Sequence, residues 1–419
     1  MFTHNIYHGK QKYNKKNKAI IVVIRKQPGE IDWVLPILNN LKKNFNVILI
    51  FEKDIALQLL KQNKVLYELF LESICCYVIN SSTKCFFLRV LLKIFKKIQI
   101  NKFSKIFQNK IYKNYYDINE LIIEIKNILP KFNSANIKIL MQDFTDNSPW
   151  IKKFSENNQK IKIISYPHTT NIFSAKKKFM NIRNNENNKN ILFLSSYGDY
   201  FHFKNKFKYY NTFICGYPKY HISWLKKVEK KSKVISRRKS EKIIFVSYKG
   251  FDSSKYYKKK YIEQVSSLFE FVKKNKKCRL VFKFHPNAQE EKVFLKIANQ
   301  YSSSLWSINQ QHLHNLSLQS NAFVSFFSNA STLDSLASNK PPIELWNISL
   351  NKKQESLYSK LKICFNCENK DTLFENLDYL LFKKFKSNKE KYIFKNFKKI
   401  LKPYQSIKLT SNLIKKISN

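Results

Sequence analysis

Two apolar stretches decide the fold of this chain: AIIVVI (Ala19–Ile24) and, one amphipathic segment later, VILIF (Val47–Phe51). Each has the length of a strand, and residues 31–43 between them have the apolar spacing of a helix. Uninterrupted apolar strands are typical of a parallel sheet that is covered by helices on both faces. The start of the chain therefore predicts an α/β protein.

The same alternation continues along the first half of the chain and starts again in the second half. Further strands are predicted in the first half at Ile137–Met141, Ile161–Ser165, Ile191–Ser195 and Thr212–Cys215, and in the second half at Ile243–Tyr248, Arg279–Phe284, Ala322–Phe327 and Ile343–Trp346. The region 65–130 is predicted to be mainly helical and is most apolar at Cys85–Ile98, and another helix is expected near Pro149–Asn157. We expect two Rossmann-like doubly wound domains that face each other across a cleft.

A basic segment with few apolar residues, KKVEKKSKVISRRKSEK (residues 226–242), separates the two halves. We predict a Rossmann-like acceptor-side domain at 1–216, a linker at 217–240, a Rossmann-like nucleotide-binding domain at 241–385 and a helical tail at 386–419. At 419 residues with 43% apolar and 25% charged residues, the chain is long enough for two cores of ordinary size.

The glycine content excludes two common nucleotide sites. Only 5 glycines occur, and neither GxGxxG nor GxxxxGK[ST] is present. A standard dinucleotide fingerprint and a P-loop are therefore both absent.

The chain is strongly basic, with 77 Lys and Arg against 29 Asp and Glu and a formal net charge of +48. Lysine is enriched together with Asn, Ile, Phe and Tyr, which share A/T-rich codons, and the lysines are spread along the chain. We therefore expect no nucleic-acid partner, although a basic binding protein for nucleic acid or anionic membrane remains an alternative of another class. The stretch Leu91–Lys110 is basic and amphipathic; it is either a helix packed on its own domain or one that lies on an anionic bilayer.

The seven cysteines do not form a disulfide pattern, and a reducing compartment fits them better. Cys364 and Cys367 make a lone CxxC, for which buried thiols are the simpler interpretation than zinc or redox chemistry. The N-terminus lacks the apolar core of a signal peptide, and no run of about 18 uncharged apolar residues occurs. We expect a cytoplasmic protein that could lie peripherally on the inner face of the plasma membrane.

Polar clusters follow the predicted strands, where ligands bind in open α/β sheets. In the second half, KFHPN (residues 283–287) places Lys283 and His285 directly after a strand, and imidazole can stabilise a leaving phosphate. Further on, SFFSNASTLD (residues 325–334) combines a strand end, a polar turn and a helix start, so that free N–H groups and hydroxyls could hold an anion. The candidate residues there are Ser328, Asn329, Ser331 and Thr332, although plain helix capping explains the same pattern.

Three more candidates are less specific. Asp143 follows the strand IKILM and could act as a general base, as could His168 in YPHTTN (residues 166–171). Glu344 could meet a ribose hydroxyl. Each also has an alternative: a turn histidine for His168 and a solvent-facing or structural carboxylate for Glu344. Asp143 and Asp146 could also be metal ligands, but their spacing is nonspecific and an Asx turn explains Asp146. No metal is needed by this scheme.

The order of these motifs resembles that of bacterial capsule and wall-polymer transferases of the GT-B fold. It runs through Asp143, Pro-His168, GYPKY (residues 216–220) with Trp224, Lys283-x-His285-Pro, Ser328-x-x-Ser331-Thr332 and Lys340-Pro341, over about residues 137–346. The closest pattern is that of CDP-glycerol glycerophosphotransferases, and the chain is also similar to sialyl- and Kdo-transferases with His-Pro and Ser/Thr motifs. The family commonly has His-Gly where this chain has His168-Thr169.

The resemblance implies that His285 and the hydroxyl cluster contact nucleotide phosphates while His168 or Asp143 deprotonates the acceptor. It implies a CDP-, CMP- or UDP-linked sugar or polyol as donor substrate, no separate cofactor, and a glycan or lipid-linked acceptor in capsule, LPS or wall-polymer synthesis. An enzyme of the UDP-N-acetylglucosamine 2-epimerase kind, on the same two-domain frame, is the alternative within enzymes.

Overall fold

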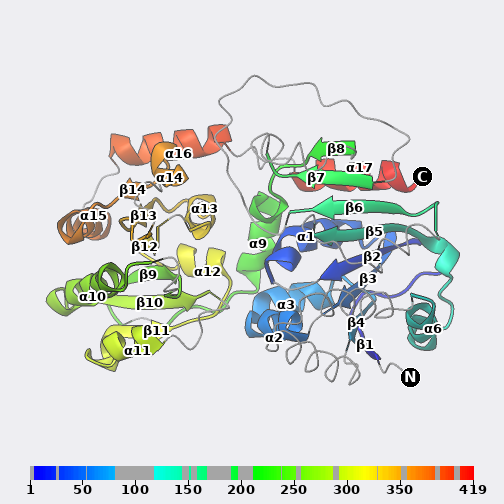
Figure 1. The fold of residues 1–419 in the computed structure, drawn as a ribbon, viewed down its shortest axis with the longest axis horizontal. Coiled ribbons are helices and arrows are strands. Elements are labelled where there is room, and N and C mark those ends of the chain that lie inside the picture. Colours follow the sequence, from blue (N-terminus) through cyan, green and yellow to red (C-terminus); the bar gives the residue numbers. More distant parts are fainter. Residues whose placement is uncertain are drawn as a thin grey trace, which may run out of the picture.

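A computed structural model gives the fold (Figure 1). It describes residues 4–24, 28–52, 54–80, 118–143, 151, 158–167, 190–196, 211–236, 238–251, 256–285, 292–327, 329–350, 356–382, 387–400 and 406–419. Within these residues, two separate sheets form, one from each half of the chain.

In the described part of the first half, eight strands form one sheet in the order β1-β4-β3-β2-β5-β6-β7-β8. All neighbours are parallel except the pair β1 and β4. The strands are β1 His4–His8, β2 Lys18–Ile24, β3 Phe45–Phe51, β4 Cys76–Asn80, β5 Ile137–Asp143, β6 Lys162–Tyr166, β7 Asn190–Leu194 and β8 Asn211–Ile214. The helices are α1 Pro28–Leu41, α2 Asp54–Gln62, α3 Lys64–Leu71 and α6 Ile118–Ile128.

Apolar residues on both faces of the central strand explain this layered arrangement. Ile20 and Val22 of β2 pack into the core that holds α1, α2 and α3. Ile21 and Val23 pack into the core on the opposite face, with Ile125 of α6. Since successive side chains of a strand point to opposite faces, a strand that is buried on both faces must be apolar at every position.

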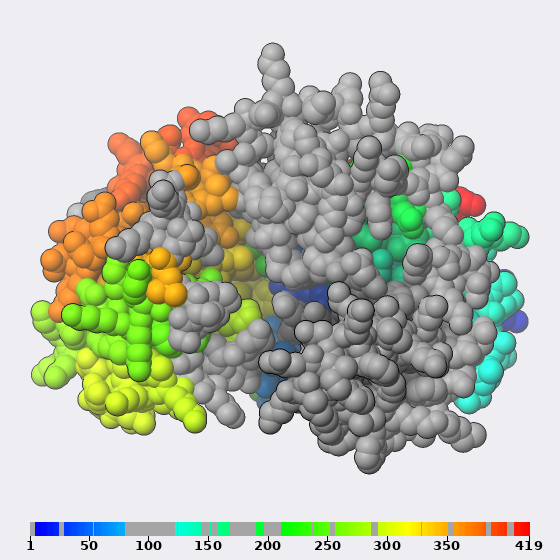
Figure 2. Space-filling model, in the orientation of Figure 1, coloured from blue at the N-terminus to red at the C-terminus, as the bar shows by residue number. Residues whose placement is uncertain are grey.

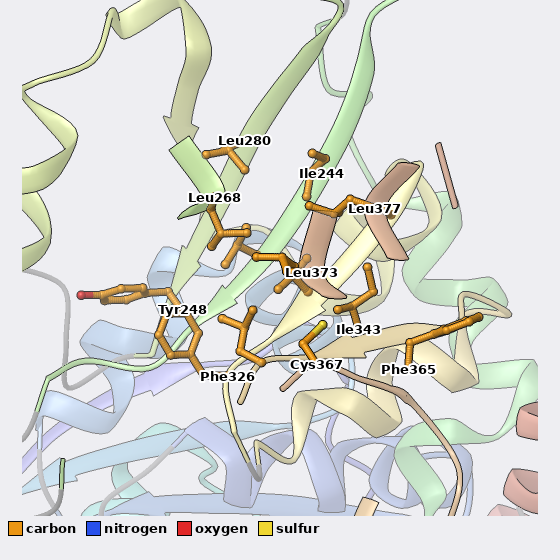
Figure 3. Close-up of a cluster of buried hydrophobic side chains, with 14 of the residues drawn as sticks. Ile244, Tyr248, Leu268, Leu280, Phe326, Ile343, Phe365, Cys367, Leu373 and Leu377 are labelled. Carbon is orange, nitrogen blue, oxygen red and sulfur yellow. The ribbon is translucent and has the colours of Figure 1, made fainter. Parts of the chain in front are cut away.

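The described part of the second half forms a sheet of six parallel strands in the order β11-β10-β9-β12-β13-β14. They are β9 Lys242–Tyr248, β10 Cys278–Phe284, β11 Trp306–Ile308, β12 Ala322–Ser325, β13 Pro342–Glu344 and β14 Phe365–Asn366. The helices are α10 Lys258–Lys274, α11 Lys292–Ala298, α12 Leu313–Leu318, α13 Ser331–Ala337, α14 Leu357–Lys360 and α15 Lys370–Phe382. Figure 3 shows the core on one face, where Ile244 and Leu280 of the sheet meet Leu268 of α10 and Leu373 of α15.

The segment 217–230 is anchored in both cores. Tyr217 and Tyr220, at the short 3₁₀ helix η2 (Pro218–Tyr220), belong to the core of the second half. Trp224 and Val228 of α9 (Ile222–Lys230) belong to the core of the first half. In Figure 1, α9 stands between the two sheets. The predicted linker therefore begins with structured, buried elements.

The C-terminal residues return to the first half of the chain. After α16 (Asn388–Ile400), helix α17 (Ser406–Ser418) packs on α1, with Ile407 and Ile414 buried in the same core as β2. Lys18 Nζ donates hydrogen bonds to the carbonyl of Ser418, at 2.9 Å, and to the side chain of Asn419. Figure 2 shows the described surface of the second half, green to orange, on one side of the molecule, and that of the first half on the other.

The fold class expected from the sequence is confirmed. The region 65–130 contains a strand, β4, which pairs in parallel with β3. Its five residues, CYVIN, follow closely after helix α3, and their pairing with β3 identifies them as a strand. The stretches Cys85–Ile98 and Leu91–Lys110 lie outside the described residues. No described helix combines the length and apolarity needed to span a bilayer.

Candidate active site at the carboxyl ends of both sheets

Lys283 and His285 lie where strand β10 ends. The Lys283 ammonium donates a hydrogen bond to the Gln310 carbonyl at 3.0 Å. Burial lowers the pKa of Lys283 to about 8, although the carboxylates of Asp32 and Asp334 act in the opposite direction. His285 is exposed to solvent. Its partial burial, with the nearby charges of Lys249 and Lys283, lowers the pKa of His285, which favours the neutral imidazole.

The turn before α13 is organised by Asn329. Its Oδ1 accepts a hydrogen bond from the Ser331 N–H at 3.2 Å, and its Nδ2 lies 3.4 Å from the Ser247 carbonyl on β9. Thr332 is fully buried, and its hydroxyl lies 2.9 Å from that of Ser325. The Ser331 hydroxyl is also buried but has no hydrogen-bond partner among the described residues. Of the two hydroxyls, that of Ser331 thus has unused hydrogen-bonding capacity.

These residues lie on one edge of the second sheet. Strand β9 lies between β10 and β12, and the His285 N–H donates to the Tyr248 carbonyl at 3.1 Å. Since neighbouring strands are about 4.8 Å apart, residues that follow β10 and β12 are separated by roughly 10 Å. The fold therefore brings Lys283, His285, Asn329 and Ser331 to the same edge.

Glu344 is held inside the second domain. It is fully buried, and its two oxygens accept hydrogen bonds from the hydroxyls of Ser356 at 2.8 Å and Ser359 at 2.7 Å. These contacts attach the start of α14 to β13. The arrangement fits the structural alternative for Glu344, and we leave this residue out of the site proposed below.

The acceptor-side candidates are only partly within the described residues. Asp143 is the last residue of β5 and is buried, opposite Tyr166 of β6 in the sheet register. The Tyr166 ring stacks on Trp33 of α1, with 5.4 Å between the ring centroids. His168 and Ser328 lie outside the described residues.

A buried charged cluster that sequence analysis missed joins the two domains. Asp32, in the first turns of α1, accepts a hydrogen bond from His312 Nε2 at 3.3 Å, and His312 precedes α12 in the other domain. The ammonium of Lys219, in η2, lies 3.8 Å from Asp32 Oδ2 and 3.3 Å from Asp334 Oδ1 in α13. We call Asp32, Lys219, His312 and Asp334 the interdomain cluster. Its members follow the carboxyl ends of β2, β8, β11 and β12.

The hydrogen bonds of His312 show how it is placed next to Asp32. Its Nδ1 accepts the backbone N–H of His314 at 3.2 Å, so the proton of the neutral ring is on Nε2 and is donated to Asp32. With both ring nitrogens engaged, His312 orients the Asp32 carboxylate and leaves proton transfer to other groups. Asp32 itself is the most exposed member of the cluster, with 19% of its side chain accessible.

Burial and neighbouring charges shift the pKa values of the two carboxylates of the cluster in opposite directions. Burial raises the pKa of Asp32, but the His312 hydrogen bond and the charges of Lys219 and Lys283 outweigh it, so the pKa of Asp32 is lowered overall. Burial also raises the pKa of Asp334, and the Asp32 charge adds to this, so the pKa of Asp334 remains raised despite Lys219. For Lys219, the two carboxylates outweigh burial and raise its pKa. Asp32 is thus the carboxylate that stays ionised.

A second buried histidine supports the cluster. His314 Nδ1 lies 2.7 Å from the Ser338 hydroxyl, and its Nε2 lies 3.1 Å from Glu229 of α9. Burial, with the nearby His312, lowers the pKa of His314 to about 4. His314 therefore joins the second domain to α9 as a neutral ring at physiological pH.

One signal in the sequence could have located this cluster. Ligands of open α/β sheets bind beyond the carboxyl ends of the strands. The segment after the first predicted strand contains Asp32, and the segment between β11 and α12 contains His312. Lys219 and Asp334 lie within the quoted motifs GYPKY and SFFSNASTLD. Their pairing is not visible there, because it joins distant parts of the chain.

Comparisons with solved structures match the whole chain. A protein of Listeria monocytogenes described as a UDP-N-acetylglucosamine 2-epimerase superposes with a TM-score of 0.55 at 13% identity, over 95% of this chain and 94% of the other. The UDP-GlcNAc 2-epimerase of Neisseria meningitidis, bound to UDP-GlcNAc, gives 0.53 at 12%, over 95% and 100%. The UGT2 of Phytolacca americana, complexed with UDP-2-fluoroglucose and pterostilbene, gives 0.53 at 10%, over 96% and 100%.

At such identities the likeness establishes the fold alone. No protein-family model and no curated protein sequence matches the chain. The two parallel-sheet domains have the arrangement of GT-B glycosyltransferases and of the epimerases that share their frame.

Proposed function

We propose that this protein is an enzyme that acts on a nucleotide-activated sugar or polyol and transfers the sugar or polyol phosphate to a glycan or lipid-linked acceptor. One observation carries the proposal. Lys283, His285 and Ser331 lie on the same carboxyl edge of the second sheet, the Ser331 hydroxyl has no hydrogen-bond partner among the described residues, and the Asp32 carboxylate of the first domain acts to raise the pKa of Lys283. Cationic and hydroxyl donors at this edge suit a diphosphate, because ligands of open α/β sheets bind where the strands end.

The second domain would bind the donor. His285, as a neutral imidazole, and the Ser331 hydroxyl would donate hydrogen bonds to phosphate oxygens, while Lys283 supplies positive charge. Asn329 holds the turn that carries Ser331. Ser328 and Thr332 remain predicted contributors. A UDP-, CDP- or CMP-linked donor fits this site, and two of the proteins with this fold are bound to UDP-linked sugars.

The first domain would supply the base. Asp143 and His168 remain candidates, and we add Asp32, whose ionised carboxylate is oriented by His312 and is partly accessible. In the transfer step, the base takes the proton of the acceptor hydroxyl, the hydroxyl oxygen bonds to the transferred carbon or phosphorus, and the nucleotide leaves with the electron pair of the broken bond. A departing phosphate next to Lys283 and His285 is stabilised as its charge develops.

A second candidate is epimerisation of a UDP-linked sugar. Several solved structures with this fold are described as UDP-N-acetylglucosamine 2-epimerases, which favours this reaction as strongly as transfer. The nucleotide site proposed above serves either reaction. Epimerisation requires no acceptor, so product analysis separates the two.

We place the reaction in surface polysaccharide synthesis, in the cytoplasm and with contact to the inner face of the membrane. The basic surface would attract an anionic, lipid-linked acceptor. This part of the proposal rests on the motif order and on the charge of the chain.

Titration calorimetry with UDP, CDP and CMP tests the donor site. We expect one of them to bind, and Ser331→Ala to weaken that binding about five- to tenfold through loss of one hydrogen bond. Ser303→Ala is the matched control, since Ser303 is exposed and lies at the amino end of β11, away from the site. Absence of binding by all three nucleotides, or equal weakening in both variants, would contradict the proposal. Incubation of the corresponding nucleotide sugar with and without a glycan acceptor then distinguishes transfer from epimerisation.

A further inference from the structure

A basic cavity lies at the opposite end of the first domain from the candidate active site. It has a volume of about 500 Å³ and is lined by the side chains of Lys12, Lys15, Lys42, Lys43 and Lys131, with Tyr13 and two asparagines. These lysines come just before β2, β3 and β5, so the cavity lies at the amino edge of the sheet. The interdomain cluster follows the carboxyl ends of strands, so the two sites are distinct.

The cations of this cavity are not neutralised within the protein. Four of the five lysines are exposed, and among the described residues none of the five forms an ion pair with a carboxylate. Lys42 alone has a fixed partner, the Glu72 carbonyl, 3.2 Å from its ammonium. Ammonium groups that line one cavity repel one another, and a bound anion with several charges relieves that repulsion.

The loop that carries Lys12 and Lys15 is held in place by buried polar side chains. The amide of Asn46, which is 1% exposed, donates to the carbonyls of Asn14 at 2.7 Å and Asn17 at 3.1 Å, and its oxygen accepts the Asn14 N–H at 2.9 Å. The loop begins at Gly9, where an added Cβ would overlap the Ile74 carbonyl. These contacts fix the loop against the amino end of β3.

Two further hydrogen bonds join the walls of the cavity. Gln11 Nε2 donates to the Lys42 carbonyl at 2.7 Å, and the Tyr13 hydroxyl donates to the Lys131 carbonyl at 2.9 Å. These two side-chain to backbone hydrogen bonds connect the three chain segments that bear the lysines. A cavity with connected walls binds at a lower entropic cost than flexible surface lysines would.

We propose that this cavity is a binding site for a phosphate-bearing anion with several charges. Its volume is in the range of small-ligand sites, but five of its eight lining residues are lysines, whereas such sites are usually lined mostly by apolar side chains. Compact, strongly hydrated ammonium groups suit phosphate oxygens. The source is either an anionic lipid headgroup or a soluble oligophosphate, and the test distinguishes them. The site is independent of the proposed donor site.

The test compares two variants of the full chain that lose equal charge. The site variant is Lys12→Gln/Lys15→Gln/Lys43→Gln. The control variant is Lys258→Gln/Lys259→Gln/Lys276→Gln, which removes three exposed lysines of the second domain. Sodium tripolyphosphate is titrated by calorimetry, and sedimentation is measured with phosphatidylcholine vesicles that contain about 30 mol% phosphatidylglycerol. Thermal unfolding verifies that both variants are folded.

We expect the site variant to bind at least one of the two probes at least tenfold more weakly, and the control to change less than twofold. Loss with tripolyphosphate alone assigns a soluble phosphate, and loss with vesicles alone assigns a headgroup; either result supports the site. Equal losses in the two variants would show general charge attraction, and binding of neither probe by the unaltered protein would show no site. Both results overturn the inference.

Discussion

Replacement of Lys219 by Met tests whether the interdomain cluster holds the two domains together. Lys219 has 15% of its side chain exposed and lies 3.3 Å from Asp334 and 3.8 Å from Asp32. At an effective dielectric constant of about 20, the gross attractions are about 5 and about 4 kcal/mol, and most of each is offset by the cost of burying the charges. Removal of one partner of a buried pair costs about 3–5 kcal/mol. We expect a loss near the lower end, about 3 kcal/mol, because Asp334 can take up a proton.

Proton uptake by Asp334 should make the stability loss of Lys219→Met depend on pH. Without Lys219, the two carboxylates face each other, and the pKa of Asp334, already raised by burial and by Asp32, rises further. The Lys219→Met variant should therefore lose less stability at pH 5 than at pH 8. Addition of Asp334→Asn should recover part of the loss at pH 8, because it removes one of the unpaired charges.

Urea unfolding, followed by tryptophan fluorescence, measures these free energies. The matched control is Lys231→Met, which also removes a lysine between two carboxylates, Glu72 at 2.7 Å and Glu68 at 3.4 Å. That lysine is 28% exposed and its partners are 32% and 54% exposed, so we expect a loss below about 1 kcal/mol. The reasoning is refuted if the two single variants lose equal stability, or if Asp334→Asn makes the Lys219→Met protein less stable still.

Three further predictions concern a buried histidine, the donor site and the C-terminal helix. The pKa of His314 is about 4 in the folded protein and 6.5 in the reference state, so the stability that depends on its neutral ring is present above pH 6.5 and is lost as the pH falls toward 4. In urea unfolding, the loss of stability between pH 7 and pH 5 should therefore be about 2 kcal/mol smaller in His314→Gln than in the unaltered protein, and should be unchanged in the exposed control His8→Gln. Because the pKa of Lys283 is about 8, nucleotide affinity measured by calorimetry should fall several-fold between pH 7 and pH 9. The variant Lys283→Arg should abolish that pH dependence. A steep fall that persists in the arginine variant would show that Lys283 is not its cause. Ile414→Ala should lower the free energy of unfolding by about 2–4 kcal/mol in urea, since Ile414 is fully buried against the first domain. Leu409→Ala, on the exposed side of the same helix, should lower it by less than about 1 kcal/mol. Similar losses in the two variants would mean that α17 does not pack on the first domain.

The central strands were predictable because burial on both faces of a sheet requires apolar residues at nearly every position. The central strands β2, β3, β9 and β10 are nearly continuous apolar runs, and all were expected within a few residues of their observed bounds. Strand β4 was not, because it lies in a region whose overall pattern favours helix, and it is defined by its pairing with β3. Edge strands β11 and β14 are shorter still.

Several candidate site residues lie on one edge of the second sheet, as expected for residues that follow parallel strands. Lys283, His285, Asn329 and Ser331 share that edge. This placement does not indicate which way a side chain points. Glu344 also ends a strand, yet its carboxylate is directed inward to Ser356 and Ser359, because α14 packs over it.

The sequence alone determined the two α/β halves and the polar ends of their strands, because hydrophobic periodicity is a local property that each segment carries by itself. Only the tertiary structure decided that Asp32 meets His312 and that Lys219 lies between Asp32 and Asp334. Those contacts join separate domains, and their electrostatic energy depends on the relative placement of two rigid cores and on the burial that this placement creates. No short stretch of the chain encodes either quantity.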